Sequence, residues 1–561
     1  MKRMSERRRK RTEKILYRNR KAKVIIYNRI FLTALAMLLQ IALFAGALIL
    51  LYSGNSYFAT LLLFATNLAG FAMILHILNR NDRPSDKLNW IIVILVLPVF
   101  GVPMFFLYGD GRPTKKMNRK IITQRKNNVA LLPPPPALSD KAAADGANAD
   151  PAAAAERYEK CDESNGISKY LTDFASSPAS FDGEVTYFSS GRQTFNAIME
   201  AVRGAKKFIL AEYFIISPGN TWSTFLQALV EKANEGVAVR LIFDNAGCLK
   251  SLPPKYDKYV ESLHPNIKCF TFNPISPVFT VRINNRDHRK QIIVDGETAF
   301  TGGINLADEY VGDIIRFGDW KDSGLKLTGS AVNTFTMMFF NIWNAFREDK
   351  DDVSAFYNHS YTALQTERRL QKANAAPEQA AAFMQPYDDS PLDKENVSAT
   401  VYLDIINRAR RYLWIYTPYL VPDDRMRTAL CSAAKRGVDV RIVVPGIPDK
   451  KLTYRLTKAN FPPLLKSGVK IYVYTPGFIH AKSMLSDDRF AVVGTINLDY
   501  RSLYLNFENA VYFSDCTVAD ELKKDCLFTF PQCREVTEKD LKKGWIGSLV
   551  DSLLRVFETL F

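Results

Sequence analysis

Two copies of the pattern His-x-Lys-x4-Asp carry the side chains best suited to chemistry in this chain. Only five histidines are present, and two of them stand 192 residues apart at equivalent places in the two copies. Each copy is followed at the same offset by Gly-x-x-Asn. One such match arises easily by chance, but two inside a repeat predict a functional site. The residues concerned are His288, Lys290, Asp295 and Asn305 in the first copy, and His480, Lys482, Asp487 and Asn497 in the second.

Together the two copies suit the chemistry of a phosphodiester. Residues two apart in an extended strand face the same side, so the His and Lys of each copy are expected to project into one cleft. There the ammonium groups and the Asn amides would neutralise the non-bridging oxygens as charge grows on them. One imidazole would attack phosphorus while the other protonates the departing alkoxide. We expect no metal, because no acidic cluster has metal-ligand spacing and the lysines supply positive charge.

The alternative interpretation of the motifs is structural. Two buried histidines with satisfied hydrogen bonds, beside exposed lysines, would explain either copy taken alone. It explains the pair poorly, because both copies keep every member of the pattern. The two aspartates of the motifs, Asp295 and Asp487, are expected to brace the turn after each strand.

The elements around the motifs also occur twice. Short apolar runs rich in β-formers alternate with helical stretches, which predicts parallel β-α-β units and an α/β fold in two similar halves. Packing of the halves about a pseudo-two-fold axis would bring the two motifs into one cleft. The paired runs are FILAEYFII (208–216) and LWIYTPYLV (413–421), GVAVRLIFD (236–244) and GVDVRIVVP (437–445), and IKCFTFNP (267–274) and VKIYVYTP (469–476).

The N-terminal part predicts a membrane segment over residues 30–110. Ile30–Tyr52 is an uncharged run of 23 residues, long enough to cross a bilayer. Tyr57–Leu78 is a second uncharged run, and Trp90–Tyr108 is a third that two prolines and a glycine interrupt. The first run is too long, and lacks the cleavage-type ending, for an ordinary signal peptide.

The basic residues are concentrated beside these runs. Residues 1–23 hold twelve Lys and Arg against two acids, and residues 111–126 hold seven and no acid. Since the net charge of the whole chain is +16, the rest is close to neutral. This pattern is typical of juxtamembrane anchoring to anionic lipid; a polybasic arm for nucleic acid is the alternative.

The same charges predict the topology of the membrane segment. Residues 1–29 (a basic tail), the loop near residues 80–87 and residues 111–126 all belong in the cytoplasm by the positive-inside rule. This requires the third run to dip into the membrane and return, which its prolines and glycine permit. If that run crosses instead, everything downstream lies outside the cell. We favour a multi-pass protein of the cell membrane with its catalytic part on the cytoplasmic side.

The finer detail of both halves resembles the cardiolipin synthase branch of the phospholipase D superfamily. The resemblance rests on NNRDHRKQIIVDGETAFTGGINLADEY, WIYTPYLVPDD and GTINLDYRSLYLNFE, and it extends over roughly residues 30–561. It implies two α/β/α sandwich halves with the active site between them, a phosphohistidine intermediate and no cofactor. The expected order is a basic stretch and Pro/Ala-rich linker (111–160), a first half (161–375), a second half (376–543) and a C-terminal amphipathic helix (544–561).

The resemblance also assigns roles to single residues. His288 would be the nucleophile and His480 the general acid and base, although that order varies within the superfamily. Glu508 and Asp322 stand where the family has carboxylates that orient the imidazoles. The alternative interpretation is that both are exposed acids near strand ends. Thr495 would add a hydroxyl donor for the phosphate, which the first half lacks because it has Gly303.

The favoured reaction joins two phosphatidylglycerol molecules and releases glycerol. A hydrolytic phospholipase D, or a transferase for another head group, shares every catalytic residue. A nuclease of the same superfamily would need a basic channel near the cleft, whereas the chain beyond residue 126 is nearly neutral. An inactive membrane scaffold is disfavoured by the intact motifs. The expected partners are phosphatidylglycerol and anionic membrane lipid, and no nucleic acid.

Overall fold

The computed structural model describes residues 20–54, 56–80, 84–109, 115–129, 131, 166–180, 182–274, 285–360, 383–393, 395–514, 517–541 and 544–556. The basic tail before residue 20 and the Pro/Ala-rich linker lie outside these residues, as do residues 557–561, which the sequence predicts as part of a C-terminal helix.

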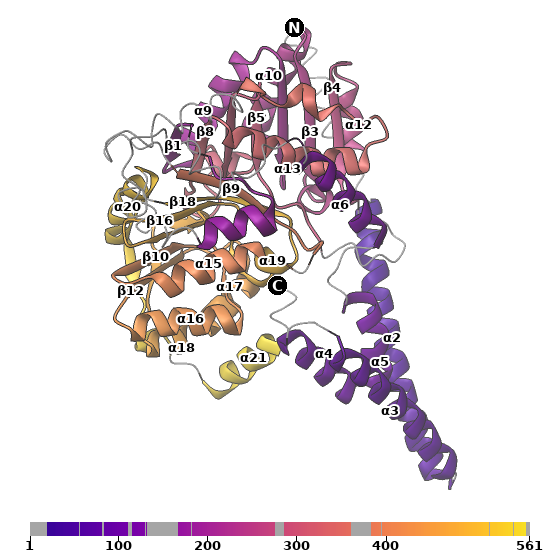
Figure 1. Cartoon of the computed structure of the whole chain (residues 1–561). Coiled ribbons are helices and arrows are strands. Elements are labelled where there is room, and N and C mark those ends of the chain that lie inside the picture. The colour runs from indigo at the N-terminus through magenta and orange to yellow at the C-terminus, as the bar shows by residue number, and fades with distance from the viewer. Residues whose placement is uncertain are drawn as a thin grey trace, which may run out of the picture.

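Two sheets with one strand order form the catalytic body (Figure 1). The first runs β1-β8-β6-β5-β2-β3-β4, and the second repeats it as β9-β18-β16-β15-β10-β12-β13 with β19 added at the edge. β2 pairs in parallel with β3 and β10 with β12, as the repeated runs predicted. The strands of the first sheet are β1 (Val185–Phe188), β2 (Phe208–Tyr213), β3 (Ala238–Asp244), β4 (Ile267–Phe272), β5 (Gln291–Val294), β6 (Thr298–Gly302) and β8 (Gly324–Thr328). Those of the second are β9 (Phe383–Asp389), β10 (Tyr412–Tyr416), β12 (Asp439–Pro445), β13 (Lys470–Tyr474), β15 (Ser483–Ser486), β16 (Phe490–Gly494), β18 (Glu508–Ser514) and β19 (Cys533–Glu535).

Helices cover both faces of each sheet, so the predicted pair of α/β/α halves is confirmed. In β2, Ile209 and Ala211 face the outer core, whereas Leu210 faces a core shared by both halves. This split follows from the two-residue period of a strand buried on both faces. The helices of the first half are α9 (Gly191–Gly204), α10 (Asn220–Asn234), α11 (Asn245–Cys248), α12 (Tyr256–Glu261), η2 (Asp308–Val311), α13 (Ala331–Phe346) and η3 (Val353–Phe356). Those of the second are α15 (Val397–Arg408), α16 (Asp424–Lys435), α17 (Lys451–Ala459), α18 (Phe461–Lys466), α19 (Tyr500–Tyr504), α20 (Thr517–Thr529), η5 (Phe530–Gln532) and η6 (Glu538–Leu541).

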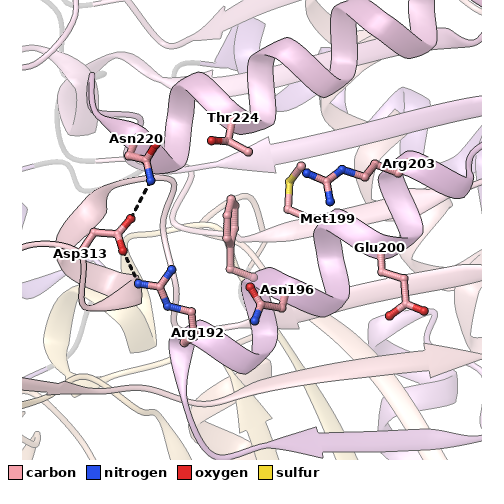
Figure 2. A pocket seen from close by; sticks show the side chains of 9 residues that line it. Arg192, Asn196, Met199, Glu200, Arg203, Asn220, Thr224 and Asp313 are labelled. Carbon is pink, nitrogen blue, oxygen red and sulfur yellow. Dashed lines mark hydrogen bonds and ion pairs between the residues drawn. The ribbon is translucent and has the colours of Figure 1, made fainter.

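Short strand pairs join elements from distant parts of the chain. β7 (Asp319–Lys321) from the first half pairs in parallel with β14 (Gly477–Ile479) from the second. β11 (Leu420–Val421) pairs with β17 (Leu498–Asp499) within the second half. The segment that leads to β7 is fixed to the outer helices, because Asp313 accepts hydrogen bonds from Arg192 of α9 and Asn220 of α10 (Figure 2).

Two segments that precede β1 in the chain pack on the second half or in the core shared by the two halves. Residues 166–175 form a helix whose Ile167 and Leu171 belong to the outer core of the second half. The basic stretch forms α6 (Lys115–Val129), which buries Met117 and Ile121 in the core shared by the two halves. It therefore docks on the catalytic body rather than serving as a simple link.

The first two hydrophobic runs form α2 (Arg20–Tyr52) and α3 (Ser56–Leu78), which extend from the catalytic body (Figure 1). Leu35–Tyr52 and Ser56–Leu78 are long and apolar enough to cross a membrane, with mean hydropathies of 2.3 and 2.0. Most of their large apolar side chains are exposed to the surroundings. This exposure is typical of helices that contact lipid.

The third run breaks at Leu97 into α4 (Pro84–Val96) and α5 (Pro98–Tyr108), each too short to cross about 30 Å of hydrocarbon. The two helices fold back on each other so closely that a Cβ on Gly101 would lie 2.8 Å from the Cα of Ile94. The Oε1 atom of Gln40 accepts from the N–H groups of Val99 (2.9 Å) and Phe100 (3.2 Å). A buried polar side chain of α2 thus accepts hydrogen bonds from N–H groups in the first turn of α5, which would otherwise be unpaired in apolar surroundings.

The C-terminal helix α21 (Trp545–Val556) packs on α17. Arg455 pairs with Asp551 at 2.7 Å and also donates to the carbonyl of Gly547 at 3.2 Å. Of the apolar face predicted for this helix, Trp545 is exposed, while the side chains of Leu549, Leu553 and Val556 lie outside the described set.

Candidate active site

Each catalytic motif is bonded through its backbone to the opposite half. The N–H of His288 donates to the carbonyl of Phe507 at 2.9 Å, and the N–H of His480 donates to that of Lys321 at 2.7 Å. Because these carbonyls immediately precede Glu508 and Asp322, the backbone bonds bring each carboxylate to an imidazole of the other half. Both histidines lie just before their strands, β5 and β15, rather than inside them as predicted.

The imidazole and carboxylate side chains then pair across the interface. Nδ1 of His288 lies 2.9 and 2.8 Å from the two oxygens of Glu508, and Nδ1 of His480 lies 2.7 Å from Oδ2 of Asp322. All four side chains are largely buried, and the two carboxylates completely so. Since Nδ1 is occupied in each ring, Nε2 is the atom left to react.

The two motif lysines lie with their histidines, as the two-residue spacing predicted. Nζ of Lys290 donates to the carbonyl of His288 at 2.6 Å, and Nζ of Lys482 donates to that of His480. Burial lowers the pKa of Lys290 to about 8 and that of Lys482 to about 7, against the opposing charges of Glu508 and Asp322. A bound phosphodiester would restore the charge of both ammonium groups.

The two motif aspartates occupy equivalent structural positions. The carboxylate of Asp295 accepts from the backbone N–H groups of residues 206–208 at 2.7 to 2.8 Å. The carboxylate of Asp487 accepts from those of residues 410–412 at 2.7 to 2.9 Å. Both residues have positive φ, 56° and 57°. They tie the turn after the motif strand to the start of β2 or β10, and this agrees with the predicted bracing role.

The three residues expected to bind phosphate differ in their contacts. The side-chain oxygen of Asn305 accepts from the N–H of Ile215 at 2.9 Å, and the Asn305 side chain also hydrogen-bonds that of Tyr310. The side-chain oxygen of Asn497 is buried without a hydrogen bond among the described residues. The hydroxyl of Thr495 donates to the Glu508 carboxylate. The same hydroxyl also bonds with the backbone carbonyl and N–H of Asn509, so its contacts are with Glu508 and the neighbouring backbone.

Gly303 is the counterpart of Thr495, and the structure explains why it has no side chain. A Cβ there would lie 1.9 Å from Oδ1 of Asp322. The shorter aspartate thus occupies the space that the threonine hydroxyl takes in the other half. Glu508 is held by the Thr495 hydroxyl, whereas Asp322 fills the space above Gly303. Both carboxylates nevertheless pair with Nδ1 of a histidine.

We expect Gly303→Ala to lower turnover about 10- to 100-fold, because it must push the Asp322 carboxylate away from His480. Steady-state kinetics of the purified protein measure this. Gly204→Ala is the matched control, since a Cβ there meets nothing within 4 Å. Equal activities for the two variants would contradict the proposed contact.

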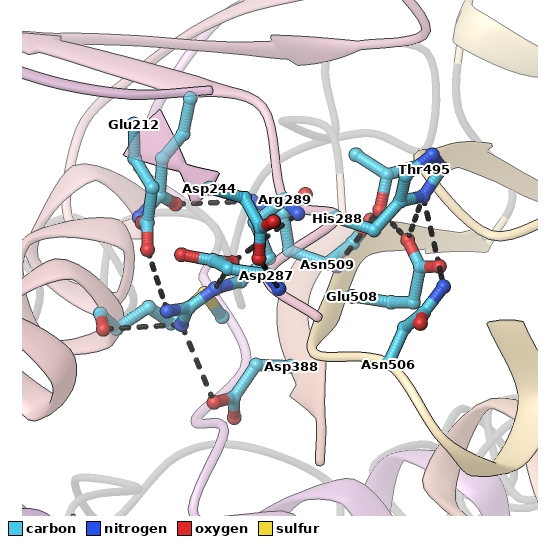
Figure 3. A network of polar contacts seen from close by, with 12 residues as sticks. Glu212, Asp244, Asp287, His288, Arg289, Asp388, Thr495, Asn506, Glu508 and Asn509 are labelled. Carbon is cyan, nitrogen blue, oxygen red and sulfur yellow. Dashed lines mark hydrogen bonds and ion pairs between the residues drawn. The ribbon is translucent and has the colours of Figure 1, made fainter. Parts of the chain in front are cut away.

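A second polar network, which the sequence did not reveal, lies behind His288 (Figure 3). Arg289 points away from the imidazole and pairs with Glu212 at 2.6 Å and with Asp287 at 3.1 Å. It also approaches Asp388 of the second half at 3.9 Å, and Asp388 lies 3.6 Å from Arg125 of α6. The available signal was the asymmetry of the motifs, because Ala481 stands at this place in the second copy.

Aromatic rings surround the imidazoles and were also missed. Trp320, Tyr310 and Phe478 have ring centroids 5.4, 5.3 and 5.8 Å from that of His480. Phe214 lies 5.0 Å from the ring of His288. These rings limit the motion of the imidazoles and exclude water from around them.

Burial and neighbouring charges set the protonation of the site. Burial, with the charges of Lys290 and Lys482, holds the pKa of His288 well below its usual value. Burial and Lys482 lower the pKa of His480 to about 3. Burial raises the pKa of Glu508 to about 7 against the charge of Lys290. At neutral pH both rings are neutral in the empty site, and a neutral ring bonded at Nδ1 can attack through Nε2.

These values predict a narrow bell-shaped dependence of kcat/KM on pH, with its maximum close to pH 7. Below about pH 7, Glu508 takes up a proton and no longer accepts from His288. Lys482 loses its proton as the pH rises above about 7 and Lys290 as it rises above about 8, so phosphate binding weakens. We expect Glu508→Gln to abolish the acidic limb and leave the basic limb. A flat wild-type profile from pH 6 to 9 would contradict this assignment.

Comparison with known proteins agrees with this geometry. The family described as "Cardiolipin synthase, PLD-like domain" matches the chain twice, over residues 195–313 and 402–526. The family described as "Phospholipase_D-nuclease N-terminal" matches residues 69–109. Cardiolipin synthase 2 of Bacillus anthracis is 31% identical over 86% of this chain and 88% of its own length. An uncharacterized protein of Streptococcus mutans is 38% identical over 86% of this chain and 97% of its own length.

A solved structure has the same fold. The phosphatidylserine synthase of Haemophilus influenzae aligns with a TM-score of 0.53 over 71% of this chain and 100% of its own, at 15% identity. Two such halves, each of which supplies one imidazole to a common site, define an enzyme of the phospholipase D superfamily. Within that superfamily the chain belongs to the cardiolipin synthase family, and it is a phosphatidyltransferase.

Proposed function

We propose that this enzyme makes cardiolipin by moving a phosphatidyl group from one phosphatidylglycerol to another. The observation that carries the proposal is the crossed pairing of two neutral imidazoles with carboxylates of the opposite half. It gives one nucleophile and one proton carrier in a single buried site. The two buried ammonium groups supply the charge that a phosphodiester needs.

In the first step, Nε2 of His288 attacks phosphorus of the donor lipid. The bond from phosphorus to the glycerol oxygen breaks, and His480 protonates the departing glycerol. Negative charge that develops on the non-bridging oxygens is balanced by Lys290 and Lys482. His480 gains its proton in the complex, because the bound phosphodiester raises the pKa that burial has lowered.

In the second step, His480 takes a proton from a glycerol hydroxyl of the second phosphatidylglycerol. That oxygen attacks phosphorus, the bond to His288 breaks, and cardiolipin is released. Asp322 and Glu508 hold Nδ1 of each ring throughout, so that Nε2 always faces the reacting phosphorus or oxygen. The buried surroundings favour the lipid hydroxyl over water.

The proposal includes a topology. α2 and α3 cross the bilayer, whereas the α4–α5 hairpin enters and returns on the same side. The N-terminus and the catalytic body are then both cytoplasmic, in keeping with the basic residues before α2 and in α6. The membrane anchor keeps the site close to a two-dimensional supply of lipid.

Expression of the full chain in a bacterial strain that lacks cardiolipin tests the proposed function. We expect mass spectrometry of the extracted lipids to detect cardiolipin with the intact protein and none with His288→Ala or His480→Ala. A rise in phosphatidic acid without cardiolipin would make the enzyme a hydrolase. No change in any lipid would overturn the proposal.

A further inference from the structure

We propose that two loops beside the active site, residues 312–318 and 446–452, insert apolar side chains into the surface of the bilayer and dock the site on its lipid substrate. Below they are called the rim loops. The proposal rests on the lipid substrate of the proposed function. It adds a second attachment to the membrane, separate from α2 and α3.

The rim loops adjoin each other and the catalytic residues. The first runs from η2 into β7, which ends one residue before Asp322. In the second, the N–H groups of Gly446 and Ile447 donate to the carbonyl of Gly477 at 2.9 and 3.1 Å, three residues before His480. A Cβ on Gly318 would lie 3.1 Å from Cδ1 of Ile447, so the two loops are in contact.

Apolar side chains on the rim loops are exposed. Ile315 is 84% exposed, Ile314 53%, Leu452 45% and Ile447 44%. Of the eight large apolar side chains that are exposed among the described residues from 166 to 541, these are four. Their concentration beside the active site marks an interaction surface rather than the scattered apolar residues of an ordinary surface.

The first rim loop is held firmly at several points. Asp313 is fixed by Arg192 and Asn220 (Figure 2), and Arg316 pairs with Glu309 at 3.3 Å. At the other end, the N–H of Asp319 donates to the carbonyl of Pro476 at 2.9 Å. The exposure of Ile314 and Ile315 is therefore built into the loop and is no consequence of a loose end.

Cations accompany the apolar side chains. The side chains of Arg316 and Lys450 are 62% and 64% exposed, and Lys451 is exposed beside them. Apolar side chains surrounded by cations fit the interface of a bilayer that contains anionic lipid. Each loop also carries one acid: Asp313 is paired with Arg192, and Asp449 accepts a hydrogen bond from the hydroxyl of Tyr419 at 2.7 Å.

The position of α21 indicates which surface the rim loops meet. The second rim loop includes the first two residues of α17, on which α21 packs, and Trp545 at the start of α21 is 78% exposed. In Figure 1, α21 lies on the side of the catalytic body from which the hydrophobic helices extend. A single bilayer could thus contact α21 and the rim loops while it contains α2 and α3. We infer that this bilayer is the occupant of the rim surface.

The test uses the full chain reconstituted into vesicles of phosphatidylglycerol and phosphatidylethanolamine. The double variant Ile314→Asp, Ile315→Asp should lose activity at least ten times more on long-chain phosphatidylglycerol in vesicles than on monomeric dihexanoyl phosphatidylglycerol. The matched control is Phe528→Asp, because Phe528 is 73% exposed on α20, which belongs to neither loop. An equal loss on both substrates, or no loss on vesicles, would overturn the proposal.

A second measurement does not depend on activity. Ile315→Cys is labelled with an environment-sensitive fluorophore, and the signal of the unsubstituted chain treated in the same way is subtracted. Lipids brominated near the head group should quench the label at residue 315 and leave a label at Phe528→Cys unaffected. Absence of quenching at residue 315 overturns the docking even if cardiolipin is made. Quenching without any cardiolipin from the intact protein would reject the proposed function alone.

Discussion

Replacement of either motif histidine with alanine should lower the rate of cardiolipin formation by about 10⁴-fold or more. His288 is expected to bond to phosphorus and His480 to carry the proton of each leaving or attacking oxygen, so neither can substitute for the other. The double variant should lose about as much activity as either single variant, because the two histidines act as one catalytic unit. The measurement is the initial rate for purified protein in lipid vesicles.

The two histidine variants differ in what they can still do. A phosphatidyl donor with a p-nitrophenol leaving group needs no proton from His480. His480→Ala should therefore release p-nitrophenol in a single burst, whereas His288→Ala should release none. His359→Ala is the matched control, because His359 is exposed; its ring lies 3.3 Å from the carbonyl oxygen of Ser354 and 5.2 Å from the ring of Tyr357. A burst from His288→Ala would reverse the assignment of nucleophile.

Replacement of the orienting carboxylates should have the next largest effect. Glu508→Gln and Asp322→Asn keep the size of each side chain but remove the charge that fixes Nδ1–H in each ring. We expect losses of about 10² to 10⁴-fold, as for the loss of the carboxylate in other imidazole-dependent sites. Circular dichroism should establish that both variants remain folded.

The two carboxylate variants should also separate by step. Glu508→Gln acts through His288, so its loss should persist with the p-nitrophenol donor. Asp322→Asn acts through His480, so the burst with that donor should recover to near the wild-type rate. Glu297→Gln, at a carboxylate that is 62% exposed, serves as the control. Identical behaviour of both variants with both donors would mean that the carboxylates do not serve separate rings.

Much of the site follows from sequence because its signals are local. The spacing in HRKQIIVD and HAKSMLSD identifies both histidines and lysines. The repeated apolar runs predict the parallel strands, among them β2 and β10, beside which the motif strands β5 and β15 pair. Asp295 and Asp487 were also expected to brace turns, since each follows its strand directly. In each of these cases the residues concerned lie within about ten positions of one another.

The crossed contacts could not be predicted in this way. Glu508 is 220 residues from His288, and Asp322 is 158 residues from His480. The sequence around each carboxylate does not indicate which imidazole it will contact. The pairing arises because β7 pairs with β14 and because the N–H of His288 donates to the carbonyl of Phe507. The contact of Thr495 with Glu508 has the same origin, as does the need for glycine at 303.

The docking of α6 illustrates the same limit. Its six basic residues suggested a juxtamembrane stretch, yet Met117 and Ile121 are buried in the core shared by both halves. Two apolar residues four apart in a highly charged stretch give a weak helical signal by themselves. The contact depends on the surface of α13, which only the folded chain presents.

The most direct test of the account is to trap the covalent intermediate. Purified Asp322→Asn protein is mixed with the p-nitrophenol donor, quenched in base to preserve phosphohistidine, digested, and its peptides are identified by mass spectrometry. The account predicts a phosphatidyl adduct on the peptide that contains His288, and none when His288 is replaced. An adduct on His480, or none on either histidine while p-nitrophenol is released, would contradict it.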